Sequence, residues 1–292
     1  MQADTTTIHV HTFADKRTVS YAHFMWNVML RLASRPDRLR LTIHGMSPKA
    51  TEAAQQMCAA DNVQCVLVQR PDWMTHDEPM AGSTGHGAAI EAALATVRDN
   101  DIHIIADADT VVVAKGWDAA IRQKIIGQRC GIVGTTYEPI GGFSSGNSTN
   151  QTYKDLPTVT WMALAPWHPW STMQARPAKT ETPYVTVETT GIYNLPVGHT
   201  LLRDVGWQIP MFIRDNGVTA LSMKHLKHDN GAVVLNAMSP YHEEFHLDGA
   251  PFVVHQRGSL RHAYRADKLS VRFYEVVDAY LASEVNRPPR WR

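Results

Sequence analysis

A short apolar run that stops at two closely spaced aspartates places the strongest constraint on how this chain can fold. Residues 102–106, Ile-His-Ile-Ile-Ala, are followed directly by Asp107 and, two positions later, by Asp109. Such a run is typical of a strand that is buried on both faces of a parallel sheet. In extended backbone the two aspartates leave the same face, where their charges repel unless a cation or a proton compensates them. The alternative is that both are turn or helix-capping residues.

The first seventy residues alternate between strand and helix patterns. β-branched residues predict a first strand at 5–13. Apolar spacing then predicts a helix with one face made of Phe24, Met25, Val28, Met29 and Leu32. A second strand is predicted at 39–45, a helix capped by Ser47 follows it, and a third strand is predicted at 63–68. This βαβαβ order predicts an α/β fold with a parallel sheet, whose ligands bind beyond the carboxyl ends of the strands.

The segments on both sides of the two aspartates follow a familiar order. A helix opened by glycine is predicted over residues 85–97, and a second helix that includes Trp117 is predicted from residue 111 onward. Helix, apolar strand, Asp-x-Asp and helix in this order resemble the nucleotide-sugar-binding half of the GT-A glycosyltransferases. The resemblance implies a Rossmann-like, mostly parallel central sheet flanked by helices, with a smaller mixed sheet on the acceptor side. It also implies that Asp107 and Asp109 hold Mn²⁺ or Mg²⁺ against the diphosphate of a nucleotide-sugar donor, for which a UDP-sugar is expected.

Two later segments resemble the same family, in the family's order. Residues 190–207 contain Gly191, in a region where the family lets the backbone approach the donor sugar. Residues 251–259 contain an apolar strand that ends in His255 and is followed by Arg257. The resemblance implies that His255 is the third protein ligand of the metal. It also implies that Arg257 neutralises the leaving diphosphate.

The acid that would act as the catalytic base is sought in residues 212–231. This segment resembles the family's combination of an acidic residue and a helix, with Asp215 at the acidic position. The family has an acidic pair here, whereas Arg214 precedes Asp215 in this chain. For a transfer with inversion, the resemblance implies that Asp215 removes the proton of the acceptor hydroxyl. Three other acids are rivals for that role: Glu188, Asp229 and Glu243.

Several residues are expected to contact the donor. In the family, the loop after the first strand and the end of the third strand cradle the nucleoside. The glycine-rich start of the helix before the Asp-x-Asp strand faces the donor as well. For each of these positions the alternative is a solvated loop side chain or an ordinary helix start. The residues that the resemblance places against the donor are Thr12, Phe13, Asp15, Arg17, Arg70, His86, Asp107, Gly191 and Arg257.

Composition fits one globular domain. Of 292 residues, 44% are apolar and 19% are charged, which is enough apolar material for a sizeable core. We expect one GT-A-like domain made of a nucleotide-sugar-binding half (1–135), an acceptor half (136–260) and a C-terminal helix with a basic tail (261–292). Three cysteines, at positions 58, 65 and 130, lack Cys-x-x-Cys spacing. They are therefore expected to be reduced thiols rather than disulfide or zinc ligands.

The sequence gives no sign of a membrane partner. No apolar stretch approaches the roughly 18 residues that a membrane-spanning helix needs. The first residues also lack the basic and apolar regions of a signal peptide. A cytoplasmic protein is therefore expected, located in the host cytoplasm if a phage encodes it.

Two classes of acceptor remain open. Lys plus Arg equal Asp plus Glu, 28 each, so net charge does not point to nucleic acid. A cluster of Trp161, Trp167 and Trp170 is either core packing or a platform on which a sugar or base stacks. The acceptor is then a hydroxymethylated base in DNA, as for some phage glycosyltransferases, or a glycan or small molecule. A non-catalytic nucleotide-sugar-binding module is the alternative to an enzyme. The C-terminal end, whose charge would suit phosphates, carries Arg257, Arg261, Arg265, Lys268, Arg272, Arg287, Arg290 and Arg292.

Overall fold

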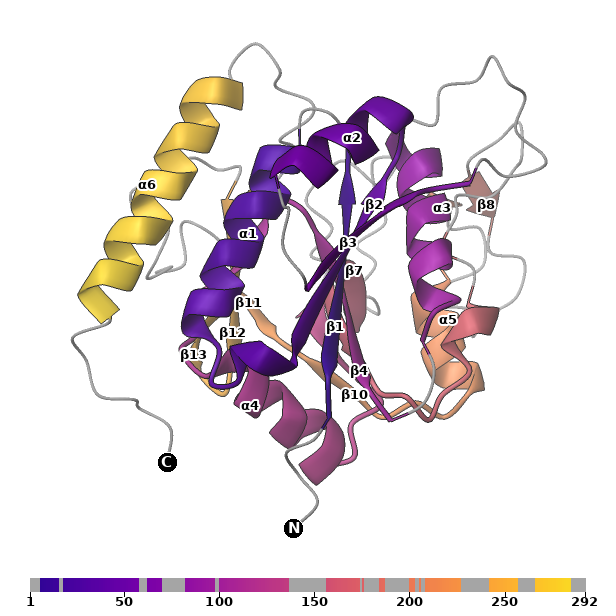
Figure 1. The fold of residues 1–292 in the computed structure, drawn as a ribbon. Helices are drawn as coiled ribbons and strands as arrows, with labels where there is room; N and C mark the ends of the chain where they lie inside the picture. The colour runs from indigo at the N-terminus through magenta and orange to yellow at the C-terminus, as the bar shows by residue number, and fades with distance from the viewer. Residues whose placement is uncertain are drawn as a thin grey trace.

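The computed structural model of the protein shows a central sheet between two layers of helices (Figure 1). The structure describes residues 6–15, 18–57, 62–69, 82–97, 100–136, 156–173, 175, 184–186, 200–202, 205, 208–226, 242–256 and 266–284. The helices in this part of the chain are α1 (Val19–Leu32), α2 (Pro48–Met57), α3 (Gly82–Leu94), α4 (Trp117–Arg122), α5 (Ile209–Asp215) and α6 (Ala266–Glu284). No helix among these residues is long and apolar enough to cross a membrane.

The central sheet has seven strands within the described residues, in the order β10-β6-β7-β4-β1-β2-β3. Strand β7 pairs antiparallel with both β4 and β6, and the other neighbouring strands pair in parallel. The predicted α/β class with a mostly parallel central sheet is therefore confirmed. The strand bounds are β1 Ile8–Ala14, β2 Leu39–Gly45, β3 Val63–Leu67, β4 Ile102–Asp107, β6 Ile132–Thr136, β7 Pro157–Leu164 and β10 Ala220–Ser222.

A smaller sheet lies beside the central one. Its order is β11-β12-β13-β5, and its pairs are antiparallel where a mixed sheet was expected. The strands are β5 Thr110–Val112, β11 Lys224–Leu226, β12 His242–Leu247 and β13 Ala250–Gln256, and a separate pair joins β8 Tyr184–Thr186 to β9 Thr200–Leu202. Because β5 follows β4 after a two-residue turn, the two sheets meet where the Asp-x-Asp motif lies.

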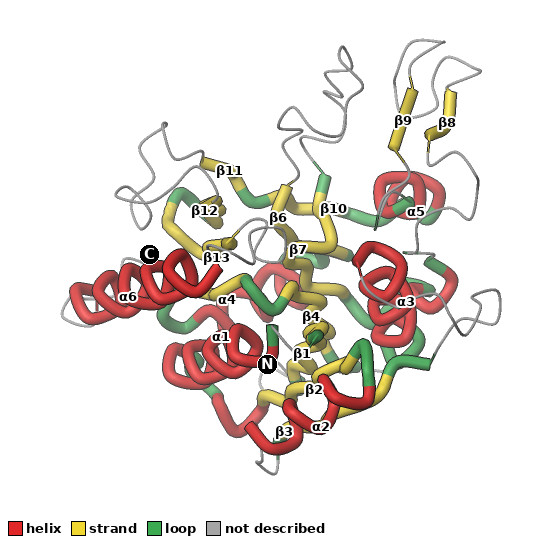
Figure 2. The backbone as a smooth tube through the Cα atoms, turned by 90° about the horizontal axis from the view of Figure 1, so that it is seen from above, coloured by secondary structure: helices red, strands yellow, loops and turns green. Residues whose placement is uncertain are grey.

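The helices divide between the two faces of the central sheet. Seen from above, α1, α4 and α6 lie on one side and α3 and α5 on the other (Figure 2). Core residues of α1, α2, α4 and α6 pack into one apolar cluster, which contains the fully buried Trp117 and Phe273. Core residues of α3 and α5 pack into a second cluster, with Ile105 of β4. Strand β4 contributes residues to both clusters, as its continuous apolar run predicts.

Most local predictions in the first half are confirmed. Strand β2 has the predicted bounds, and β1 and β3 agree with their predictions within three residues at either end. Helix α2 begins with Pro48, and Oγ of Ser47 accepts a hydrogen bond of 3.2 Å from the backbone N–H of Ala50, so the predicted cap is present. The predicted helices that contain residues 24–32 and 85–94 are α1 and α3.

Two helix predictions need correction. Residues 111 and 112, predicted to open a helix, belong to strand β5, and the helix begins only at Trp117. Pairing with β13 supplies the hydrogen bonds that keep this segment extended. In residues 212–231, the described helix α5 ends at Asp215 instead of following it, and strands β10 and β11 come next. Residues 190–199, which include Gly191, lie outside the described residues.

The tryptophan cluster is core packing. Trp161 and Trp170 are 1% and 0% exposed, and Nε1 of Trp170 donates a hydrogen bond to the carbonyl oxygen of Ala165. The ring of Trp167 is covered by the guanidinium of Arg129, which lies 4.1 Å from the ring centroid. Each of the three rings therefore packs against other residues of the protein.

A row of histidines crosses the central sheet. Nδ1 of His11 lies 3.1 Å from Nε2 of His44, and Nε2 of His11 lies 3.0 Å from Nδ1 of His103. His9 stacks on His103 and contacts Asp101 with its Nε2, 3.2 Å from Oδ2. Burial, reinforced by the neighbouring imidazoles, holds the pKa of His11 well below its usual value, and burial lowers the pKa of His44 to about 4. His11 and His44 are therefore neutral at physiological pH.

Candidate metal and donor site

The turn between β4 and β5 brings the two sheets together. Oγ1 of Thr110 donates a 2.6 Å hydrogen bond to the carbonyl oxygen of Asp107, which closes the turn. The carbonyl oxygen of Asp109 accepts a hydrogen bond of 3.0 Å from the backbone N–H of Gln256. Strand β13 pairs with β5 so that His255 stands opposite Thr110. The register of the small sheet therefore fixes His255 beside the Asp-x-Asp motif.

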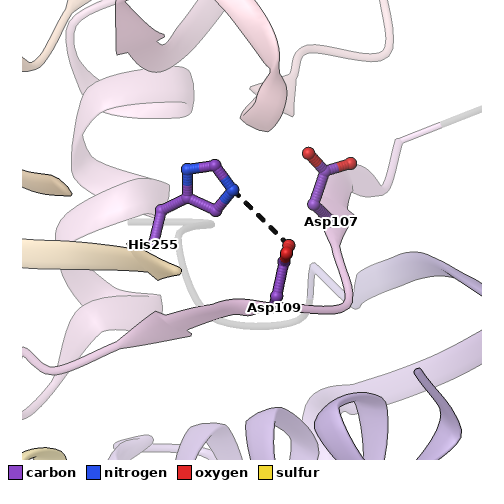
Figure 3. A group of neighbouring side chains, drawn as sticks. All are labelled: Asp107, Asp109 and His255. Carbon is purple, nitrogen blue, oxygen red and sulfur yellow. Dashed lines mark ion pairs between the residues drawn. The ribbon is translucent and has the colours of Figure 1, made fainter. Parts of the chain in front are cut away.

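Asp107, Asp109 and His255 form one cluster (Figure 3). One ligand atom from each residue lies within 4.8 Å of the others. Nε2 of His255 is 3.5 Å from Oδ1 of Asp109, and the carboxylate of Asp107 faces the same space in Figure 3. The side chains are 10–19% exposed, so water screens their charges only partly. Two carboxylate oxygens and one imidazole nitrogen make a donor set that suits Mn²⁺ or a similar divalent cation.

A histidine of α3 contacts the first aspartate. Nε2 of His86 lies 2.9 Å from Oδ1 of Asp107, which joins the start of α3 to the end of β4. The ring of His86 also packs on that of Phe13, with centroids 5.1 Å apart. The structure thus brings together five of the residues predicted to form the site: Phe13, His86, Asp107, Asp109 and His255.

The charge of His255 depends on the two carboxylates beside it. Burial of the ring lowers its pKa, but Asp109 and Glu243 outweigh that cost and raise the pKa of His255 to about 10. In the absence of a cation the imidazole is therefore protonated at neutral pH. Its positive charge then offsets part of the repulsion between Asp107 and Asp109.

Glu243 and His225 extend the cluster behind His255. Oε2 of Glu243 is 2.8 Å from Nδ1 of His255, and Oε1 of Glu243 is 3.6 Å from Nε2 of His225. Glu243 was considered from the sequence only as a rival for the catalytic base. No sequence signal pointed to His225, because its short strand β11 reaches Glu243 only through pairing with β12.

Tyr274 is a second residue that sequence reasoning missed. It lies on α6 and packs against a small buried cluster that contains Ala108, the residue between the two aspartates. The centroid of its ring is 5.3 Å from that of Tyr21 and 4.4 Å from that of Phe24. Burial raises its pKa, and the nearby Tyr21 and Asp109 add to that effect, so the hydroxyl stays neutral. Helix α6, expected from the sequence only as a C-terminal helix, therefore packs against the Asp-x-Asp turn. Two adjacent aromatic residues, at 273 and 274, are the sequence signal from which a buried face of this helix could have been predicted.

The predicted residues near the end of β1 have structural roles. Thr12 is fully buried, and Phe13 packs between the rings of His86 and His44. Oδ1 of Asp15 accepts a 3.0 Å hydrogen bond from the backbone N–H of Thr18, whose Oγ1 accepts one of 2.9 Å from the N–H of Asp15. This reciprocal arrangement fixes the start of α1. Contacts of these three residues with a donor remain predictions.

The structure does not bring Asp215 to the cluster. Helix α5 ends at Asp215, and β10 begins a few residues later. Through the pairings of the central sheet, the first residue of β10 is in register with His103, near the start of β4, and β10 runs parallel to β4. Asp215 therefore lies near the amino ends of the parallel strands, whereas Asp107 lies at the carboxyl end of β4. Its exposed carboxylate is 2.8 Å from Nε of Arg214. Arg17, Arg70, Gly191 and Arg257, and the rival acids Glu188 and Asp229, lie outside the described residues.

Comparison with known proteins gives partial matches among solved structures. No protein-family model matches the sequence, and no curated protein does so. The structure of S. aureus TarS residues 1–349 aligns with 55% of this chain and 47% of its own, at 9% identity and a TM-score of 0.37. The galactosyltransferase LgtC, solved with donor and acceptor sugar analogs, aligns over 57% of this chain and 60% of its own, at 14% identity and a TM-score of 0.36. The mannosyltransferase PcManGT from Pyrobaculum calidifontis, solved with GDP-Man and Mn²⁺, aligns over 54% and 44%, at 12% identity and a TM-score of 0.36. The matches span less than two thirds of each of these chains.

Proposed function

We propose that this protein is a metal-dependent glycosyltransferase of the GT-A type that moves a sugar from a nucleotide sugar to an acceptor hydroxyl. The observation that carries the proposal is the convergence of Asp107, Asp109 and His255 at one point. These residues come from the Asp-x-Asp motif and from a strand far along the sequence, and the resemblance to the GT-A family assigned metal binding to all three. The donor proposed is a UDP-sugar, and the ion proposed is Mn²⁺ or Mg²⁺.

The chemistry of the cluster suits a diphosphate donor. A divalent cation held there would neutralise charge on the departing diphosphate. Asp107 and Asp109 would supply the oxygen ligands, and His255 would supply the nitrogen ligand. His86, at the start of α3, would orient Asp107 on the side of the site that the family turns toward the donor. Arg257, which follows β13, is proposed to contact the leaving diphosphate as well.

The acceptor proposed is a hydroxyl of a glycan or small molecule. The DNA alternative used the tryptophan cluster as a stacking platform for a flipped base. Trp161 and Trp170 are buried, and Arg129 covers the ring of Trp167, so their packing does not favour that role. A hydroxymethylated base in DNA stays as the competing acceptor, because the basic residues of the C-terminal end would contact phosphates.

The test of the proposed function is the release of nucleotide from the donor. With Mn²⁺ and a panel of UDP-sugars, the wild-type protein should release UDP slowly to water and faster with an acceptor. Asp109→Ala should reduce the release at least 100-fold, since it removes an oxygen ligand. Asp101→Asn is the matched control: Asp101 precedes the same strand and binds the backbone N–H of Thr7 and the ring of His9, away from the cluster. No release with any sugar, together with intact nucleotide binding, would instead indicate a non-catalytic binding module.

Mass spectrometry of the products separates the two acceptor classes. The protein is incubated with mixed UDP-sugars, Mn²⁺ and either hydroxymethylcytosine-containing DNA or a saccharide panel. A hexose-sized gain on a saccharide supports the proposed acceptor. The same gain on the nucleoside would assign the protein to DNA modification.

A further inference from the structure

A carboxylate stands behind the imidazole of the candidate metal site. Glu243 of β12 and His255 of β13 are directly opposite each other in the antiparallel pair. Oε2 of Glu243 lies 2.8 Å from Nδ1 of His255, while Nε2 on the other side of the ring lies 3.5 Å from Oδ1 of Asp109. The imidazole is thus held between two carboxylates, one at each ring nitrogen.

This contact decides which ring nitrogen of His255 is available to a metal. An ionised carboxylate can only accept hydrogen bonds, so the proton of a neutral His255 ring must be on Nδ1. The lone pair is then on Nε2, which points to Asp109 and to the space shared with Asp107 (Figure 3). With the other tautomer, the ring would place an N–H where a cation should bind, and two lone pairs would meet at Glu243.

We propose that Glu243 is a positioning residue that fixes His255 as a metal ligand through Nε2. The inference rests on the proposed metal site, and it assigns Glu243 a role other than the catalytic base. Nε2 of His225 lies 3.6 Å from the second oxygen of Glu243, so a second imidazole lies near the carboxylate. The side chains of Glu243 and His225 are 13% and 6% exposed, so water competes little for these contacts. A carboxylate in this position also raises the basicity of the metal-binding nitrogen.

The inference predicts a defined order of Mn²⁺ affinities in the absence of nucleotide. Glu243→Ala should weaken Mn²⁺ binding by about 10- to 100-fold, as the loss of a partner of a metal-binding histidine does. Glu243→Gln should recover part of that loss, since its amide oxygen still accepts a hydrogen bond from Nδ1–H. Dissociation constants would be measured by electron paramagnetic resonance of free Mn²⁺ and by calorimetry. Unfolding curves in EDTA show whether each variant is folded, and the glutamine variant is decisive if the alanine variant is not.

A matched control separates the contact from a general loss of negative charge. Asp248 lies in the turn of the same hairpin, with its φ of 52°, and pairs with Nζ of Lys124 at 2.8 Å, away from His255. Asp248→Asn removes one negative charge and keeps a residue type that tolerates this backbone conformation. Its Mn²⁺ dissociation constant should stay within about twofold of the wild-type value.

A double-mutant cycle distinguishes positioning from a purely structural role. If Glu243 acts through His255, then Glu243→Ala in a His255→Ala background should cause no further loss of Mn²⁺ affinity. The inference is overturned if Glu243→Ala and Glu243→Gln bind Mn²⁺ as tightly as wild type, or if the loss is equally large without His255. Failure of the metal site itself has another signature, which is wild-type Mn²⁺ affinity in Asp109→Ala.

Discussion

Nε2 of His86 lies 2.9 Å from Oδ1 of Asp107, so the glycine-rich start of α3 and the end of β4 meet at a single carboxylate. The same aspartate belongs to the cluster with Asp109 and His255. One side chain therefore connects the helix predicted to face the donor with the residues predicted to hold the metal.

This contact leads to a prediction for His86. Replacing His86 with alanine removes the partner of a carboxylate that is proposed to bind metal, and the loss of such a partner typically weakens metal binding about 10-fold or more. Mn²⁺ titration of His86→Ala should therefore give a higher dissociation constant. His23→Ala is the control, because His23 lies on α1 and contacts Asn27 on the surface. Equal Mn²⁺ affinity in the two variants would exclude this role for His86.

Metal binding should stabilise the protein and promote nucleotide binding. Mn²⁺ at 100 times its Kd should raise the free energy of unfolding by about 2.7 kcal/mol, a shift of several degrees in Tm. UDP should bind more tightly with Mn²⁺ than in EDTA. Asp109→Ala should lose both responses, whereas Asp101→Asn should keep them. Calorimetry that gives the same UDP affinity in EDTA as in Mn²⁺ would contradict the metal site.

Asp215→Asn should leave turnover within about twofold of wild type. Asp215 lies near the amino ends of the parallel strands, whereas the cluster lies at their carboxyl ends. Its exposed carboxylate is paired with Arg214. Exposed pairs of this kind contribute little, so the free energy of unfolding should change by less than about 0.5 kcal/mol. Steady-state kinetics of the variant check the prediction. A 100-fold fall in kcat would restore Asp215 as the catalytic base and would require this segment to rearrange.

The buried histidines predict a loss of stability in mild acid. Burial lowers the pKa of His44 to about 4 and that of His11 well below its usual value near 6.5. As pH falls below about 6.5, the unfolded chain takes up protons that the folded protein does not, so the free energy of unfolding decreases and levels off below the folded-state pKa. For His44 the loss is on the order of 3 kcal/mol between about pH 6.5 and 4. Urea unfolding should show a shallower pH dependence for His44→Gln than for wild type. If the free energy of unfolding depends on pH equally in both proteins, His44 takes up its proton as readily in the folded protein as in the unfolded chain.

Salt should have little effect on the use of a neutral acceptor. Recognition of a saccharide or small molecule rests on hydroxyl hydrogen bonds and stacking, which salt screens weakly. DNA would instead give a steep slope of log affinity against log salt concentration, and each lost phosphate contact would reduce that slope by about one. Removal of Arg287, Arg290 and Arg292 should therefore leave acceptor binding and UDP binding unchanged. A salt slope that becomes flatter in this triple variant would support the DNA acceptor.

Local sequence patterns determined strand β4, the start of α2 and the residue types of the candidate metal site. The apolar run before Asp107 predicts a strand buried on both faces. In the structure each face of that strand packs into a separate core cluster. The hydroxyl of Ser47 predicts the start of α2, because a cap depends only on residues within one turn of the helix. His255 was found because a predicted apolar strand ends in it, at the position where the family resemblance implies a metal ligand.

Only the tertiary structure decided which distant residues meet. Residues 111 and 112 form a strand because β13 is available to pair with them, and no local pattern contains that partner. The register of β12 against β13 places Glu243 opposite His255. The direction of β10 places Asp215 near the amino ends of the parallel strands, away from the cluster. Side-chain periodicity predicts which face of an element is buried. The pairing of strands that are far apart in sequence decides what that face contacts. The free energy of strand pairing comes from contacts between the two segments rather than from the conformational preferences of either segment alone.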